Sequence, residues 1–122
     1  MILDAGPLIS ADRNGRALAA LMAVALETGE VLRTSQAVVA QVWRSPNQAN
    51  LAHALKAIDI IDNFGNGRQI GELLQASSTT DPVDAHLAVL ARRLREPILT
   101  GDTGDFNKLA QHVAIDVTHW HG

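Results

Sequence analysis

Short apolar runs alternate along the chain with longer segments in which apolar residues recur every three or four positions. The short runs are rich in branched apolar residues and are bounded by polar or turn-forming residues, so they predict strands. They are residues 1–4, 31–34, 58–61, 98–100 and 113–117, of which 58–61 is the most ambiguous. The first run ends before Gly6 and Pro7, both of which interrupt a strand ladder. Residues 118–122 are predicted to form a tail.

The segments between these runs have the periodicity of helices. In the first of them an apolar stripe precedes a helix stop at Gly29. The stripe consists of Leu18, Leu21, Met22, Ala25 and Leu26. Ser35 is a good N-cap for a second helix, which meets no breaker before Pro46. Residues 47–57, 69–76 and 106–110 are predicted to be helical as well.

The clearest helix start in the sequence lies at Asp81. We predict Asp81 as the N-cap, Pro82 as the first helical residue and Asp84 in the first turn, with the helix ending before Pro97. The inward stripe of this helix is Val83, Leu87, Leu90, Ala91 and Leu94. Capping explains Asp81 better than metal binding does, and the helix macrodipole, worth ~0.3–1 kcal/mol, is a structural alternative for Asp84.

Strands that alternate with helices through short connections predict an α/β sandwich. Its central sheet should be mostly parallel and flanked by helices. With 122 residues the chain is near the commonest domain size, so we expect a single domain over residues 1–122. In open parallel sheets, ligands bind beyond the carboxyl ends of the strands, at the point where strand order reverses.

The composition narrows the classes of function. A net charge of −3 with 13 acidic residues argues against a broad electrostatic grip on a polyanion, and two Trp, two Phe and no Tyr exclude widespread base stacking. Cysteine is absent, and no apolar stretch is long enough to span a membrane. The sequence therefore predicts a cytoplasmic protein whose contacts with nucleic acid are local.

Aspartates stand where predicted strands lead into helices. Asp4 closes the first strand, Asp84 opens a helix, and Asp102 and Asp105 follow the strand at residues 98–100. If three of these carboxylates converge at about 5 Å, each pair repels by roughly 3 kcal/mol at an effective dielectric constant near 20. A divalent cation with a preference for hard oxygen ligands, Mg²⁺ or Mn²⁺, removes that cost.

Each aspartate also has a simpler explanation, and other motifs fit poorly. Asp4 begins a sequence with ordinary turn chemistry, and Asp102 and Asp105 lie in a glycine-containing loop. The loop lacks the further ligands of an EF-hand and the Gly-Lys-Ser/Thr of a phosphate-binding loop. A phosphatase of the haloacid-dehalogenase type needs a second Asp two residues after Asp4, where Gly6 stands.

Taken together, four segments resemble the PIN-domain family, and the compact length resembles the VapC toxins of bacterial toxin–antitoxin pairs. The segments are Ile2-Leu3-Asp4, Val38-Val39-Ala40-Gln41-Val42-Trp43-Arg44, Val83-Asp84-Ala85-His86-Leu87-Ala88 and Leu99-Thr100-Gly101-Asp102-Thr103-Gly104-Asp105-Phe106. The resemblance implies a PIN-like fold and a metal-dependent endoribonuclease. Asp4, Asp84 and Asp102 would then bind one or two Mg²⁺ or Mn²⁺ ions, with Asp105 as an outer member of the site. It also implies a homodimer and a small antitoxin partner.

One position departs from the family pattern. Most members have a glutamate on the helix after the second strand, where this chain has Gln41. A glutamine offers a carbonyl oxygen to a metal or a water, but it carries no charge and takes up no proton. A catalytically weak or inactive PIN module that acts by binding RNA or protein is therefore the alternative to a ribonuclease.

Basic, aromatic and imidazole side chains are further candidates for contacts with a nucleic acid or a metal ion. Arg13, Arg16 and Arg44 are predicted phosphate contacts, whereas the arginines near the end of the Asp84 helix are better explained as a solvated face. These arginines are Arg92, Arg93 and Arg95. Trp43 is better explained as a core or interface residue than as a base-stacking platform. No third ligand stands at a zinc spacing from His119 and His121.

Overall fold

A sheet of five parallel strands lies at the centre of the computed structural model, which describes all residues 1–122. The strand order is β3-β2-β1-β4-β5, and each neighbouring pair is parallel. The strands are β1 (Ile2–Leu3), β2 (Arg33–Ser35), β3 (Asp59–Ile61), β4 (Ile98–Thr100) and β5 (Val117–His119). Chain order reverses between β1 and β4, which places the expected ligand crevice beyond the carboxyl ends of these two strands.

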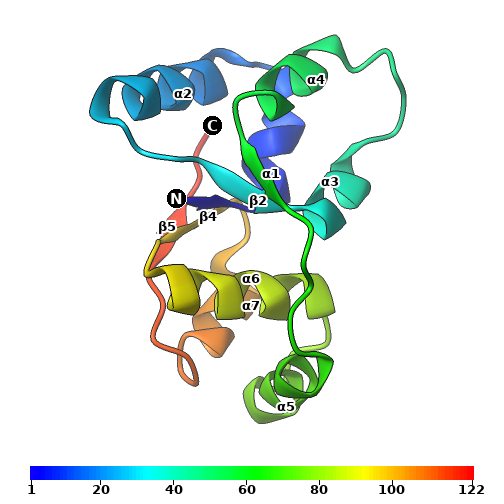
Figure 1. Cartoon of the computed structure of the whole chain (residues 1–122), viewed down its shortest axis with the longest axis vertical. Helices are drawn as coiled ribbons and strands as arrows, with labels where there is room; N and C mark the ends of the chain where they lie inside the picture. The colour runs from blue at the N-terminus through cyan, green and yellow to red at the C-terminus, as the bar shows by residue number, and fades with distance from the viewer.

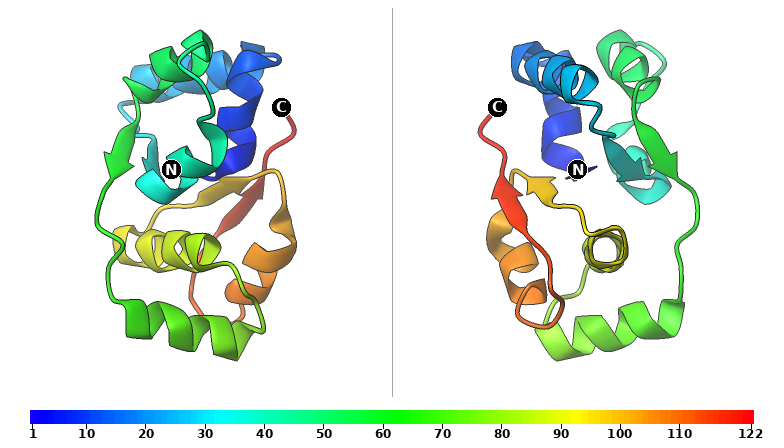
Figure 2. Two further views of the ribbon diagram at one scale, coloured as in Figure 1. Left: turned by 90° about the vertical axis from the view of Figure 1, so that its right-hand side faces the viewer. Right: turned by 60° about the vertical axis from the view of Figure 1, so that its left-hand side comes forward.

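Helices cover both faces of the sheet and make a three-layer α/β/α arrangement (Figure 1). One layer precedes β3 in the chain and contains α1 (Ala5–Ile9), η1 (Ser10–Asp12), α2 (Arg16–Thr28), α3 (Gln36–Val42) and α4 (Ala49–Leu55). The other layer contains α5 (Gly67–Ser77), α6 (Pro82–Leu94) and α7 (Thr103–Leu109). The two side views in Figure 2 show these layers above and below the strands. The predicted α/β sandwich is confirmed, and its sheet is wholly rather than mostly parallel.

Helix α6 is the structural centre of the second layer. Its residues 85–88 are all buried, as are Leu90 and Ala91, so the helix is enclosed on most sides. Side-chain oxygens cap the start of four helices. Ser35 accepts a hydrogen bond from the Val38 amide, Asn66 from two amides of α5, Asp81 from the Val83 amide and Asp102 from the Gly104 amide. The position of Asp84 is therefore determined by a rigid, buried helix.

The structure corrects several predicted elements at the ends of the chain. The last strand is Val117–His119 rather than residues 113–117, and the Trp120 amide continues the ladder by donating to the Thr100 carbonyl oxygen at 2.7 Å. The first strand ends before Gly6 and Pro7 as predicted, and these two residues lie in the first turn of α1, where a proline costs no intrahelical hydrogen bond. The predicted tail at residues 118–122 is thus wrong for residues 118–120.

The predicted apolar stripe on α2 is also partly wrong. Leu18 and Ala25 are buried, but Leu26 is 86% exposed at the end of the helix, beside Gly29. Gly29 does end the helix, in the left-handed conformation at φ +74°. The stripe fails at Leu26 because successive residues lie about 100° apart around a helix, so Leu26 points away from the face that buries Ala25. Apolar spacing does not reveal how wide a face the neighbouring elements cover.

Charged groups connect the amino ends of the central strands. Glu96 accepts hydrogen bonds from the Met1 ammonium group at 2.7 Å and from the Arg33 guanidinium at 2.9 Å, and Arg33 also pairs with Asp59. These two cations hold the pKa of Glu96 below its usual range although partial burial opposes the shift. No helix in the structure is long and apolar enough to cross a membrane.

Candidate metal centre

Asp4 lies directly after β1, at the point where the sheet reverses its strand order. Leu3 is in register with Leu99, so Asp4 comes beside Thr100, and the Asp4 amide donates to the Leu99 carbonyl oxygen at 2.9 Å. The Thr100 hydroxyl donates to Asp4 Oδ2 at 2.8 Å. The register of two buried strands therefore determines where the first carboxylate points.

A close approach of two backbones brings the loops after β1 and β4 together. A Cβ atom on Gly6 would lie 3.0 Å from the Gly101 nitrogen and 3.3 Å from its Cα. Any larger residue at position 6 must push these loops apart. Since Asp4 and Asp102 flank the contact, the two glycines keep the carboxylates on one side of the sheet edge.

The other acids lie at the starts of α6 and α7. Asp102 is the N-cap of α7 and accepts a hydrogen bond from the Gly104 amide at 3.1 Å, while Asp105 lies in the first turn of that helix. Asp81 is the N-cap of α6 and accepts from the Val83 amide at 2.8 Å, with Asp84 in the first turn. The structure thus brings the first turns of two helices to the end of β1.

The carboxyl groups are close enough to influence one another's ionisation. Burial raises the pKa of Asp84 to about 7, and the neighbouring charges add to the shift. In decreasing order of influence the neighbours are Asp81, Asp4, Asp105 and Asp102. The pKa of Asp4 is also raised, first by burial and then by Asp81 and Asp102, although hydrogen bonds from Ala5 and Thr100 oppose the rise. The four predicted acids therefore lie in one cluster together with Asp81. We call this cluster of Asp4, Asp81, Asp84, Asp102 and Asp105 the acidic basin.

The donor set of this basin fits a hard divalent cation, although no three of its groups are already close enough to share one ion. Asp4, Asp81 and Asp102 each direct one carboxylate oxygen to a local hydrogen-bond donor, which leaves the other oxygen for a ligand. Asp84 and Asp105 accept no side-chain hydrogen bond at all, and Asp84 retains a proton up to about pH 7. Because ionisation of Asp84 is unfavourable in the metal-free fold, a nearby cation would stabilise its charged form more than that of an ordinary carboxylate.

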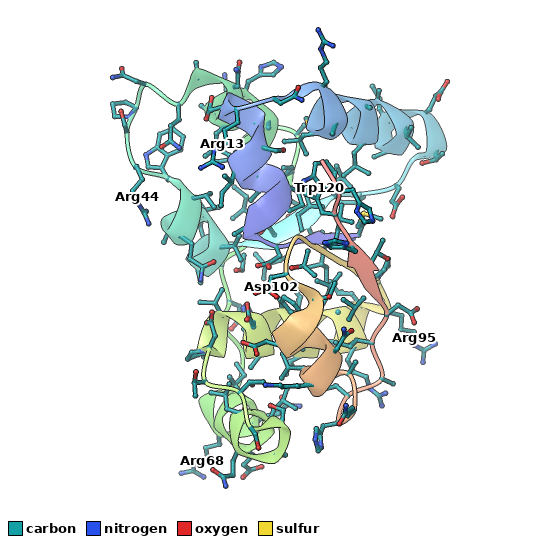
Figure 3. The ribbon with its side chains drawn as sticks, turned by 180° about the vertical axis from the view of Figure 1, so that it is seen from behind. Arg13, Arg44, Arg68, Arg95, Asp102 and Trp120 are labelled. Carbon is teal, nitrogen blue, oxygen red and sulfur yellow. The ribbon has the colours of Figure 1, made fainter.

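The remaining predicted residues lie on α3, which follows β2. Gln41 is exposed on this helix, and its amide has no hydrogen-bond partner. Arg44 donates through Nη1 to the carbonyl oxygens of Ala40 and Trp43, both at 2.8 Å, so it closes the end of α3 and is only partly free for a phosphate. Figure 3 shows Arg13 and Arg44 in the upper helix layer, above and to the left of Asp102 in that view. Trp43 packs against the core, as its neighbours Val39 and Val42 suggest.

Sequence reasoning missed three members of this region. Asp81 was explained by capping, which the structure confirms, but its charge also has the largest influence of any neighbour on the Asp84 pKa. Thr100 was read only as a strand residue, and the hydroxyl that contacts Asp4 gave no signal in the sequence. His119 was placed in a tail, whereas its Nε2 lies 3.3 Å from the Gly101 carbonyl oxygen, beside Asp102.

His86 has a structural role. It is only 4% exposed, its Nε2 contacts the Asn63 carbonyl oxygen at 3.0 Å, and its ring lies 5.0 Å from that of Phe64. Burial lowers the pKa of His86, and Nε2 donates to Asn63 because a carbonyl oxygen can only accept. The contact holds the loop before α5 against α6.

Replacing Thr100 by valine is expected to weaken the site without unfolding the chain. Valine keeps the shape but removes the donor to Asp4 and the acceptor for the Asp102 amide, both of which are buried or half-buried. We expect a loss of about 1–3 kcal/mol of stability and a further rise in the pKa of Asp4. Chemical denaturation and NMR titration of the Asp4 carboxyl measure the two effects. Thr100→Ser retains the hydroxyl and is the matched control; an equal loss in both variants would assign the effect to packing.

The fold is similar to two solved structures at low sequence identity. A chain of VapBC2 from Rickettsia felis, in a structure bound to a DNA fragment from the promoter, aligns with a TM-score of 0.67 and 15% identity over 98% of this chain and 97% of that chain. FitAcB from Neisseria gonorrhoeae aligns with a TM-score of 0.60 and 17% identity over 99% of both chains. No family model and no curated protein sequence matches the chain. The likeness establishes a PIN-like fold.

Proposed function

We propose that this chain is a metal-dependent endoribonuclease, the toxin of a toxin–antitoxin pair of the VapC kind. One observation carries the proposal: three separate segments of the chain, with Asp4, the pair Asp81 and Asp84, and the pair Asp102 and Asp105, bring mutually interacting acids to the sheet's switch point. Carboxylates so placed destabilise the fold unless a cation or protons neutralise them. The PIN-like fold and the order of the motifs support the same activity.

The residues have distinct tasks in this proposal. Asp4 and Asp102 would hold Mg²⁺ or Mn²⁺ directly, Asp84 would hold it directly or through water, and Asp105 and Gln41 would orient water at the rim. Thr100 fixes the orientation of Asp4 through its hydroxyl group. The cation supplies polarisation of the scissile phosphate, a lower pKa for the attacking water and stabilisation of the departing oxygen. The aspartates contribute negative charge in fixed positions, which aligns the ion with the phosphodiester bond.

The partners follow from the same resemblance. We propose a cytoplasmic homodimer whose substrate is RNA and whose inhibitor is a small antitoxin protein. A basic side chain of such a partner would complement the acidic basin in the absence of a cation. Net charge is no obstacle to an RNA substrate, because bound cations reverse the sign of the potential at the basin.

The direct test is an RNA cleavage assay with the purified full-length chain. We expect cleavage with Mg²⁺ or Mn²⁺ and none when the cations are removed by EDTA. Calorimetric titration of the metal, with Asp84→Ala as the control, tests the site independently of turnover. Undiminished cleavage in EDTA would refute the metal-dependent mechanism.

A non-catalytic binding module is the second candidate, and Gln41 is the observation that favours it. Its exposed amide adds no charge to the basin, and no three acids are already close enough to share an ion. Metal binding without RNA cleavage under every cation tested would support this candidate.

Replacing Gln41 by glutamate is expected to tighten metal binding and raise cleavage at low Mg²⁺. An added carboxylate that reaches the ion should contribute about 1–1.5 kcal/mol, or roughly a tenfold lower dissociation constant. Gln75→Glu adds the same charge at an exposed position on α5 and is the control. The measurement is the Mg²⁺ concentration at half-maximal cleavage or binding; equal values for the two variants would contradict a role for position 41 in the site.

A further inference from the structure

A cavity of about 630 Å³ lies at the other end of α6 from the acidic basin. It opens between the C-terminal end of α6 and the segment that leads into β5. Its wall contains Arg92, Arg93 and Arg95, with Glu96 and Asp116 as the only acids. In a chain with a net charge of −3, this is a concentrated positive region.

The arginines of this cavity are free to bind an anion. None of them forms an ion pair, because the ion pairs of the structure involve only Met1 and Arg33 as cations. Glu96 is already neutralised by those two groups. Asp116 is thus the only acid of the wall without a compensating partner, and the cavity remains positive.

Arg95 lies at a backbone position that glycine usually occupies. Arg95 ends α6 in the left-handed conformation, with φ 56° and ψ 44°. Glycine is the usual residue at this position because a Cβ atom is strained there. A cation at the end of α6 interacts favourably with the negative end of the helix dipole, which is a structural explanation for Arg95. Arg92 and Arg93, in the last turn of the helix, already make this interaction.

The surface between the acidic basin and the cavity has suitable chemistry for a nucleic acid strand. Helix α7 begins at the basin with Asp102 and Asp105, and the segment after it forms the cavity wall. Its seven residues span about 10 Å. Exposed residues along this route can donate hydrogen bonds to phosphates; they are Asn107, Lys108, Gln111 and His112. Figure 3 shows Asp102 at the start of α7 and Arg95 beside β5 in one view.

We propose that the arginine cavity binds phosphodiester groups of the RNA substrate at a distance from the bond that is cleaved. This inference rests on the proposed ribonuclease function and adds to it a second contact, which holds the strand that leaves the basin over α7. Guanidinium groups bind phosphate oxygens in a bidentate manner, and such contacts give affinity without base specificity. The basin alone repels RNA until a cation is bound, so the cavity supplies attraction that does not depend on metal.

The experiment measures RNA binding apart from cleavage. The probe is a fluorescein-labelled oligouridylate of about 12 nucleotides, within the usual ~4–16 nucleotides of single-strand sites. Binding is followed by anisotropy in EDTA, using full-length protein with Asp4→Asn to exclude cleavage. Arg92→Gln with Arg95→Gln is compared with Lys56→Gln and Arg68→Gln, which remove two exposed charges, one directly after α4 and one on α5. Arg93 is retained because its charge also acts on His86.

We expect the cavity variant to bind the oligouridylate about 5–20-fold more weakly than the parent. Its plot of log affinity against log salt should be shallower by about 1.4, since each contact with a single strand contributes about 0.7. The control variant should change affinity less than about twofold. Equal losses in the two variants, or no binding by the parent, would overturn the proposal. So would saturation of the cavity by uridine monophosphate or inorganic phosphate at the same affinity, which would identify a small-anion site.

A second variant separates binding from structural support. Arg95→Gly relieves the backbone strain, so we expect a higher thermal midpoint, by about 2–6 °C, together with weaker RNA binding. Lower stability and unchanged binding would show that Arg95 serves the fold alone. If wild-type protein fails to cleave RNA while the arginine effect persists, the ribonuclease proposal fails and the binding site stands.

Discussion

Asp4→Asn is expected to abolish RNA cleavage, with a loss of at least about 10²–10⁴-fold in rate. The asparagine keeps the shape and leaves an oxygen to accept from Thr100, but it removes the charge at the carboxyl end of β1 that the cation needs. Losing one direct ligand should cost several kcal/mol of transition-state stabilisation, and each 1.36 kcal/mol is about tenfold in rate. Single-turnover cleavage of RNA in saturating Mn²⁺ measures the loss of chemistry apart from weakened metal binding.

The control for this prediction is Glu72→Gln, which makes the same change of charge at an exposed position on α5, outside both the basin and the arginine cavity. Asp4→Asn should fold at least as well as the parent, because burial already raises the pKa of Asp4 and opposes its charged form. Unfolding curves establish this point before any rates are compared. Retention of more than about a tenth of the parent rate would show that Asp4 is not a metal ligand.

Asp84→Asn is expected to stabilise the metal-free protein near pH 8 while it eliminates catalysis. Moving the pKa of Asp84 from 3.8 to about 7 corresponds to at most about 4 kcal/mol, and we expect about half of this because the side chain is half-exposed. The variant should therefore unfold about 5–10 °C higher than the parent in EDTA at about pH 8. Thermal unfolding over a pH series measures the difference.

The pH dependence has a defined sign. The folded state holds the Asp84 proton more tightly than the unfolded chain does, so this contribution is fully present below about pH 4 and is lost as pH rises toward about 7. The advantage of Asp84→Asn should consequently grow between about pH 4 and pH 7 and then level off. Saturating Mg²⁺ should remove the advantage by stabilising the parent alone. A difference in stability that stays constant with pH would contradict the shared acidic basin.

In both predictions, removing one charge from the acidic basin abolishes RNA cleavage but does not destabilise the metal-free fold. The parent chain keeps a carboxyl group where the metal-free fold would be more stable without its charge. A purely structural role for Asp84, as a first-turn acid that favours the helix dipole, predicts the reverse result. Measurement of stability therefore tests the site even before an RNA target is known.

Local signals predicted most of the secondary structure. Ser35, Asp81 and Gly29 mark helix ends through their own backbone and side-chain preferences, and all three act as expected. The predictions failed where long-range packing decides. The ladder of β5 extends to Trp120 because β4 lies beside it, and Leu26 is exposed because no neighbouring element reaches it.

By itself the sequence determined the α/β alternation, the helix caps and the four aspartates as candidates for one site. These features depend on periodicity and on short-range chemistry, which a linear chain carries in full. Only the tertiary structure decided that Asp81 belongs with those aspartates, that Thr100 orients Asp4, and that Arg92 and Arg95 line a cavity. Strand register, the Gly6–Gly101 contact and the exposure of each side chain arise from pairing between distant segments, and no local pattern specifies them.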